Sequence, residues 1–210
     1  GATAQNISTL VEQLLEVSRI ETGHLDVKME NVSVAELFAE LAAEFAPVAA
    51  SKGFFFLTRP LPLTVHTDPL FVKRILTNLI TNAIRYSRKP GSKIVLAARR
   101  LRNGRITIGV YDQGPGISEE DRHRIFEAFY RGEAGKHSET GYGLGLSIVS
   151  GLAKRLGIPI TVGSRLGRGS VFRLEFTSVK NAAADHAADG LPLTTDLDMR
   201  GVVGILEDND

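Results

Sequence analysis

Apolar and polar residues alternate in short blocks along the chain, and their spacing predicts a series of helices and strands. Near the start, Ile7, Leu10, Leu14 and Val17 recur at heptad spacing, which predicts a helix over 5–22. Two heptads are too short to form a stable helix alone, so this helix needs a partner. The pattern fits equally well a helix packed on its own domain and a piece of a dimeric helical bundle.

Capping residues typical of helix N-termini predict two further helices. Ser33 and Glu36 match a capping box and predict a helix that ends near residue 51. Asp68 and Pro69 combine an N-cap residue with a proline at the first helical position, and predict a helix that ends near residue 86. The other patterns predict an extended stretch over 25–32, strands over 54–58, 93–100 and 106–111, a turn at 103–104, a short helix from 118, a helix from 145 to about 157, and a hairpin of 160–164 with 170–176. Because hairpins are mixed with helices, we expect an α+β fold with helices on one face of a sheet.

Composition narrows the class of protein. The chain has 210 residues, 43% of them hydrophobic, which is enough for one domain with a core. A formal net charge of +1 gives no overall attraction to nucleic acid, and the absence of cysteine excludes disulfides and thiolate metal sites. No apolar run is long enough to span a membrane. We expect a cytoplasmic piece of a longer protein, with any membrane anchor upstream of Gly1.

The first polar cluster interrupts the apolar helix predicted after Pro69. Asn78 and Asn82 are four residues apart, so they share one face of this helix. Asn is a poor helix former, and its amide oxygen is a ligand that suits Mg²⁺ bound together with phosphates. On spacing alone, two exposed or capped amides are an equally good reading.

The second cluster, Asp112-Gln-Gly114-Pro-Gly116, directly follows a predicted strand. Its glycines permit a ligand to approach the backbone closely, and a carboxylate at the strand end could accept a hydrogen bond from an adenine amino group. Taken alone, an ordinary Asp-Gly turn is the better reading.

The third cluster is a run of alternating glycines, Gly141, Gly143 and Gly145, that opens a predicted helix. Backbone N–H groups at a helix start bind phosphates well. The run is not a P-loop, because no Gly-Lys-Ser/Thr follows it, and no βαβ unit surrounds it as in a dinucleotide fold.

Together, the order and spacing of these clusters are specific. The asparagine cluster, Asp-x-Gly-x-Gly, the segment Phe126-Glu-Ala-Phe129-Tyr-Arg131 and Gly-x-Gly-x-Gly-Leu resemble the N, G1, F and G2 boxes of sensor histidine protein kinases, members of a wider ATPase superfamily that includes gyrase. The resemblance covers residues 5–178. It implies a two-layer α/β sandwich that binds ATP under a lid over about 117–142, which we expect to be mobile without nucleotide.

The resemblance also implies a role for each residue of the boxes. Asn82 coordinates the Mg²⁺ that bridges the phosphates, and Arg131 stabilises the γ-phosphate, so both are expected catalytic residues. The expected nucleotide contacts are Asn78, Arg85 and Tyr86 beside Asn82; Asp112, Gly114 and Gly116 at the adenine; Phe126 and Phe129 as anchors of the lid; and Gly141, Gly143, Leu144 and Gly145 around the phosphates.

The resemblance divides the chain into regions. Residues 14–23 are similar to the end of the second dimerisation helix, so 1–24 is expected to be the end of a dimerisation region that precedes a catalytic ATP-binding domain over 25–178. The Ala- and Asp-rich residues 179–200 are expected to form a linker. Residues 201–210, an apolar run followed by acidic residues, resemble the start of a truncated receiver domain, as in a hybrid kinase. The expected partners are the dimerisation domain, a receiver domain and, in the full-length protein, a second copy.

Phosphoryl transfer fits this pattern better than ATP hydrolysis. In gyrase-like relatives a Glu one turn before the metal-binding Asn activates water, whereas this chain has Asn78 there, which cannot accept a proton. The alternatives are an ATPase of the wider superfamily and a nucleotide-binding regulatory module. The phosphoacceptor box, a His followed by Glu or Asp, is absent from the context of all five histidines, which are His24, His66, His123, His137 and His186.

Overall fold

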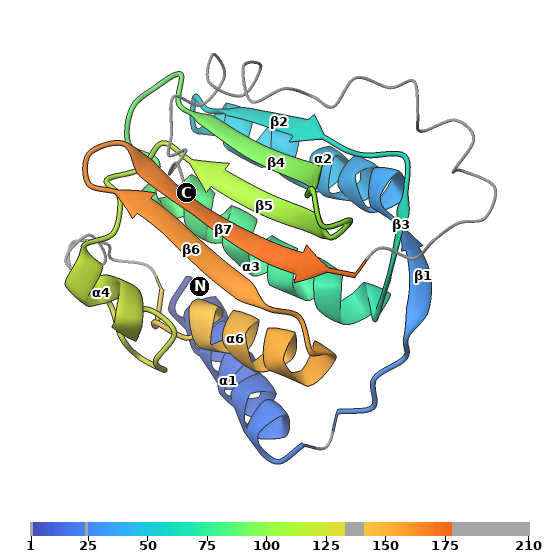
Figure 1. Ribbon diagram of the computed structural model, residues 1–210. Helices are drawn as coiled ribbons and strands as arrows, with labels where there is room; N and C mark the ends of the chain where they lie inside the picture. Colours follow the sequence, from blue (N-terminus) through green and yellow to red (C-terminus); the bar gives the residue numbers. More distant parts are fainter. Residues whose placement is uncertain (1, 24, 133–140, 178–210) are drawn as a thin grey trace.

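The structure is a computed structural model, and it describes residues 2–23, 25–132 and 141–177 (Figure 1). The helices are α1 (Ala2–Glu21), α2 (Val34–Ser51), α3 (Pro69–Tyr86), α4 (Glu119–Arg124) and α6 (Gly145–Leu156). The strands are β1 (Glu30–Ser33), β2 (Phe55–Arg59), β3 (Thr64–Thr67), β4 (Lys93–Arg100), β5 (Ile106–Asp112), β6 (Ile160–Arg165) and β7 (Gly169–Phe176). The predicted linker and receiver start, and residues 133–140 of the predicted lid, lie outside the described residues.

The main sheet has five strands in the order β2-β4-β5-β7-β6. β2 runs parallel to β4, and the other neighbours are antiparallel. Helices α2, α3 and α6 lie on one face of this sheet (Figure 1). This arrangement confirms the predicted α+β fold and its two layers.

The core lies between the helices and the sheet. Alternate residues of the central strands, such as Ile94 and Leu96 on β4 and Ile106 and Ile108 on β5, are fully buried against the helices. On α3 the apolar stripe contributes Val72, Ile75, Leu76, Leu79, Ile80, Ala83 and Ile84. Burial of each large aliphatic side chain contributes roughly 1.5–3 kcal/mol, so this stripe fixes which face of α3 remains outside the core. The asparagines lie on that other face.

The predicted helix starts are confirmed. The Ser33 hydroxyl accepts the Glu36 N–H at 3.3 Å, and the Asp68 carboxylate accepts the Phe71 N–H at 3.0 Å. Asp68 has a second task, because its other oxygen accepts the Lys28 N–H at 2.8 Å. One carboxylate therefore caps α3 and fastens the segment that leads from α1.

Strand β3 was not predicted. It pairs antiparallel with β1 in a separate two-stranded sheet. Of the predicted extended stretch over 25–32, only the end is a strand, and this strand continues to Ser33. The two strands are four residues long and lie more than 30 residues apart in sequence, so local patterning carries little trace of their pairing.

The C-terminal half of α1 packs on its own domain, the first of the two predicted alternatives. Val17 and Ile20 contact the core, and α6 lies alongside the helix (Figure 1). Four other apolar positions, Ile7, Val11, Leu14 and Leu15, are 40–58% exposed. This exposed seam leaves room for the helical bundle of the second alternative. Within the described ranges, no helix is long and apolar enough to cross a membrane.

Candidate functional site

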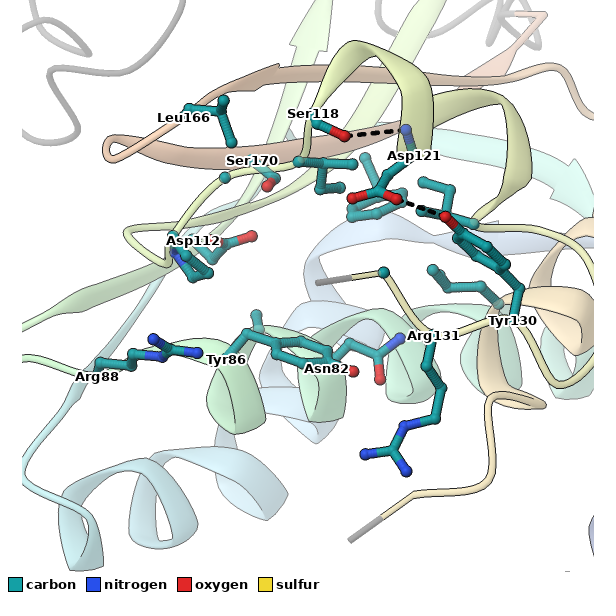
Figure 2. A pocket seen from close by; sticks show the side chains of 18 residues that line it. Asn82, Tyr86, Arg88, Asp112, Ser118, Asp121, Tyr130, Arg131, Leu166 and Ser170 are labelled. Atoms are coloured by element: carbon teal, nitrogen blue, oxygen red, sulfur yellow. Dashed lines mark hydrogen bonds between the residues drawn. The ribbon is translucent and has the colours of Figure 1, made fainter. Parts of the chain in front are cut away.

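A cavity of about 500 Å³ opens between α3, the loop after β5, α4 and the β6–β7 turn (Figure 2). A second cavity of about 210 Å³ adjoins it on the side of α1 and the 141–145 loop. Asn82, Tyr86 and Arg131 line both cavities, so the two share part of their walls. Figure 2 shows Asp112 and Arg131 on opposite sides of the larger cavity, with Tyr86 and Asn82 between them.

Asp112 forms a buried acceptor at one end of the larger cavity. Its position as the last residue of β5 leaves it 7% exposed. Burial raises the pKa of its carboxyl group to about 6, although hydrogen bonds from the backbone of Gly114 and Ser170 oppose the rise. The Gly114 N–H donates to Oδ1 at 2.7 Å. The second oxygen can accept a hydrogen bond from an amino group in an otherwise mostly apolar cavity.

The two glycines after Asp112, Gly114 and Gly116, allow the loop to pack closely against neighbouring protein atoms. Gly116 has φ +76°, and a Cβ there would lie 2.3 Å from the carbonyl oxygen of Arg165. A Cβ at Gly114 would lie 2.8 Å from Oδ1 of Asp112. Close approach of the base was the expected reason for both glycines. The atoms that crowd these positions belong to the protein itself, so glycine is required here even before a ligand is considered.

The asparagine cluster lies where the two cavities meet. Asn82 lines both cavities, and Asn78 lines the smaller one. The Asn78 amide N–H₂ donates to the carbonyl oxygen of Arg74 at 3.0 Å. Its oxygen lies 3.3 Å from the position of a Cβ at Gly145, and the Asn82 amide atoms lie 3.8 and 3.9 Å from the same point. The missing side chain of Gly145 therefore leaves space directly beside both amides.

The alternating glycines form the outer wall of the smaller cavity. Gly141 has φ +112°, and a Cβ there would lie 2.4 Å from Nη1 of Arg85. Gly143 has φ +74°, and its carbonyl accepts the Phe129 N–H at 3.0 Å. Helix α6 begins at Gly145 without a side-chain cap, so its first N–H groups can serve an anion. Leu144 is buried, and its side chain belongs to the core.

The segment around Phe126 is attached differently from the prediction. Phe126 packs edge-on against Phe172, with ring centroids 6.3 Å apart, as expected of an anchor. Phe129 is 61% exposed, so the expectation that its side chain anchors the lid is wrong. Its backbone has φ +65° and forms the attachment instead, through the hydrogen bond to Gly143.

Several residues of the larger cavity were missed from the sequence, among them Tyr130, Asp121 and Leu166. The Tyr130 hydroxyl donates to Asp121, and this hydrogen bond raises the pKa of Tyr130. The Arg124 guanidinium lies 4.3 Å from the centre of the Tyr130 ring. Leu166, in the β6–β7 turn, lines the cavity although 65% of its side chain is exposed. Tyr130 stands inside a recognised box, whereas nothing in the sequence marks Asp121 or Leu166.

The described residues fit a cation only as part of a complex with phosphates. Among them, no group of three or more His, Cys, Asp or Glu residues could hold a metal alone. The Asn82 amide oxygen, 3.9 Å from the point that a Cβ at Gly145 would occupy, is a type of ligand that suits Mg²⁺, which takes few protein ligands and completes its shell with phosphate oxygens and water. His66 and His123 line neither cavity, and the other three histidines lie outside the described residues.

Comparisons with known proteins agree with this geometry. The family described as "Histidine kinase-, DNA gyrase B-, and HSP90-like ATPase" matches residues 67–180. The sensor-like histidine kinase SenX3 of Mycobacterium tuberculosis is 34% identical over 184 residues, which is 87% of this chain and 44% of SenX3. The chain therefore spans less than half of that relative.

Solved structures match the fold as well. Full-length ShkA in complex with AMPPNP superimposes with a TM-score of 0.74 at 30% identity, over 85% of this chain and 37% of ShkA. The nucleotide-free catalytic domain of the histidine kinase ThkA gives a TM-score of 0.61 at 27% identity, over 72% of this chain and 96% of that domain.

Proposed function

Since this chain belongs to the family of histidine kinase-, DNA gyrase B- and HSP90-like ATPases, we propose that it is the catalytic domain of a sensor histidine kinase in two-component signalling. It would bind ATP with Mg²⁺ and transfer the γ-phosphoryl group to a histidine of the dimerisation domain. One observation carries the proposal: a buried carboxylate and a glycine-rich helix start with two asparagine amides lie at opposite ends of adjoining cavities.

Each end of the cavities suits one part of ATP. Asp112 would accept a hydrogen bond from the adenine amino group. Arg85 and the first N–H groups of α6 would bind the phosphates, and Arg131 would neutralise the charge of the γ-phosphate. Asn82 would hold Mg²⁺, which supplies charge neutralisation between the phosphates when bound. The contribution of the chain is thus positioning and electrostatics, which is what phosphoryl transfer mainly requires.

The walls of the smaller cavity favour transfer over hydrolysis. Its described lining residues include no Asp or Glu, and the residue one turn before Asn82 is the amide Asn78. Hydrolysis needs a base to activate water, and neither amide can accept a proton. In the larger cavity, Asp112 lies at the opposite end and Asp121 accepts the Tyr130 hydroxyl, so neither is placed to take that role.

We also propose the wider setting of the domain. The protein would act with its own dimerisation domain, as a homodimer, and pass the phosphoryl group to a receiver domain. Residues 201–210 would begin such a receiver in the same chain, as in a hybrid kinase, because an apolar run precedes Glu207 and Asp208.

The test uses a separate protein that carries the missing first dimerisation helix, with its His box, and a matching second helix. Mixed with this chain and Mg-ATP, that protein should gain an acid-labile phosphoryl group, because a phosphoramidate hydrolyses in acid and a phosphoserine ester does not. The Asn82→Ala variant should bind Mg-ATP at least tenfold more weakly and abolish the transfer. Acid-stable labelling of this chain alone would contradict the kinase chemistry. Steady-state phosphate release without a partner would favour the ATPase alternative.

A further inference from the structure

Helix α1 contributes to the wall of the smaller cavity, although none of the four sequence boxes lies on it. Thr9 and Gln13 of α1 line this cavity together with Asn78, Asn82 and Arg85. Neither α1 residue lines the larger cavity that contains Asp112. Gln13 is half-buried, whereas its neighbours Glu12 and Leu14 are exposed. Its side chain therefore faces the phosphate end of the site and not the base end.

An ion pair between α1 and α3 lies next to this cavity. Glu16, one turn after Gln13, binds Arg74 of α3 through two hydrogen bonds of 3.1 and 2.7 Å. Arg74 in turn offers its carbonyl oxygen to the amide of Asn78 at 3.0 Å. The bidentate geometry defines orientation as well as distance. Gln13 is thus held close to the asparagine face of α3 by a contact that is itself linked to that face.

Two further contacts hold the C-terminal end of α1. Cγ2 of Ile20 lies 2.5 Å from the position that a Cβ at Gly151 would occupy, so the helix can approach α6 closely only because residue 151 is glycine. The Arg155 guanidinium donates to the carbonyl oxygens of Gly23 at 3.3 Å and Leu25 at 3.0 Å. These contacts attach the C-terminal end of α1 to α6, in the orientation that places Gln13 at the cavity wall.

The chemistry of the cavity selects an anion as the partner of Gln13. The described lining has the positive charges of Arg85 and Arg131 and no carboxylate. A glutamine amide is an uncharged donor of two hydrogen bonds, so it can bind a phosphate oxygen without competing for the cation. We propose that Gln13 donates a hydrogen bond to the terminal phosphate of bound ATP, and that the Glu16–Arg74 ion pair positions it for this contact. The inference rests on the proposed function of the same site.

The two nucleotides ATP and ADP provide the test, since only ATP carries the terminal phosphate. Calorimetry with Mg-ATP and Mg-ADP should show that Gln13→Ala weakens ATP binding about tenfold or more, the effect of one hydrogen bond to a charged group. ADP affinity should stay within twofold of wild type. Arg19→Ala, an exposed substitution on the same helix that lines neither cavity, is the matched control and should change neither affinity.

The positioning role needs a second variant. Arg74→Met keeps most of the aliphatic length and removes the ion pair, so it should cause a similar ATP-specific loss. In the Arg74→Met background, Gln13→Ala should then have little further effect, because the helix no longer holds Gln13 in place. Thermal unfolding of each variant would verify that the domain remains folded.

The outcomes separate this inference from the proposed function. If wild type binds ATP and Gln13→Ala leaves the ratio of ATP to ADP affinity unchanged, Gln13 does not contact the terminal phosphate and the inference is overturned. Additive effects of Gln13→Ala and Arg74→Met would overturn the positioning role. If wild type binds no nucleotide at all, the proposed function fails as well.

Discussion

At the base end of the paired cavities, part of the wall comes from the central strands of the sheet, whereas at the phosphate end the wall comes from separate helices and a loop. Asp112, Ser170 and Phe172 belong to adjacent central strands and are 4–7% exposed. Arg85 on α3, Gly141 in the loop and Gln13 on α1 are only partly buried and come from three distant parts of the sequence. The base end therefore shares the stability of the core, and the phosphate end depends on how well independent elements are held together.

The largest expected difference between the two ends is in how much stability a glycine-to-alanine substitution costs at each of them. Gly116→Ala would place a Cβ 2.3 Å from backbone oxygen at φ +76°, so we expect a loss of at least about 3 kcal/mol in the free energy of unfolding. Gly141→Ala would meet the mobile end of Arg85, which can move away, so we expect only about 1–2 kcal/mol, from the strained φ.

Urea unfolding measures both variants, and calorimetry with Mg-ATP measures what remains of binding. Gly141→Ala should fold and yet bind ATP clearly more weakly, because it displaces Arg85 from the phosphate side. Equal losses of stability in the two variants would show that the ends do not differ as the packing indicates.

Base selectivity should come from the base end alone. A carboxylate at Asp112 accepts a hydrogen bond from the amino group of adenine, whereas guanine presents a carbonyl oxygen there, and two acceptors repel each other. We expect ATP to bind more tightly than GTP by about 1–3 kcal/mol, the cost of an unpaired buried acceptor. Asp112→Asn, which adds a donor, should shift the preference toward GTP. A competition titration with equal affinities in the wild type would refute this assignment.

Most of the fold could be predicted because its signals are local. The Ser33 and Asp68 caps, and the apolar runs along β4 and β5, gave element limits that agree with the structure to within about one residue. Strand β3 could not be predicted, since Pro60 and Pro62 precede it and its partner lies far away in sequence. The packing of α1 depends on Ile20 meeting Gly151, a contact between residues 131 positions apart that periodicity cannot indicate.

The site was predictable where its residues lie in short motifs. The glycines and asparagines could be located from their spacing, although the physical reason for Gly116 is its approach to the β6–β7 turn. The role of Phe129 was misjudged because the motif does not distinguish a side-chain anchor from a backbone one. Leu166 and Gln13 carry no motif, and only the three-dimensional arrangement places them at the two cavities.

The smallest expected effect is the pH dependence that Asp112 imposes on stability. Burial raises the pKa of this carboxyl group from 3.8 to about 6, so the folded protein holds the proton more tightly than the unfolded chain. The stability that this proton contributes is fully present below about pH 3.8 and is lost as the pH rises through about 6.

Part of that loss falls in a range where the protein can be measured. By linkage, about 1 kcal/mol of the loss falls between pH 5 and pH 8. Asp112→Asn removes the titration, so its free energy of unfolding should fall by about 1 kcal/mol less than that of wild type over this range, measured by urea unfolding in matched buffers. Comparing the change with pH cancels any fixed cost of the new amide group. Parallel pH profiles would mean that the buried end holds its carboxylate ionised at little cost, and the contrast between the two ends would then lie in packing alone.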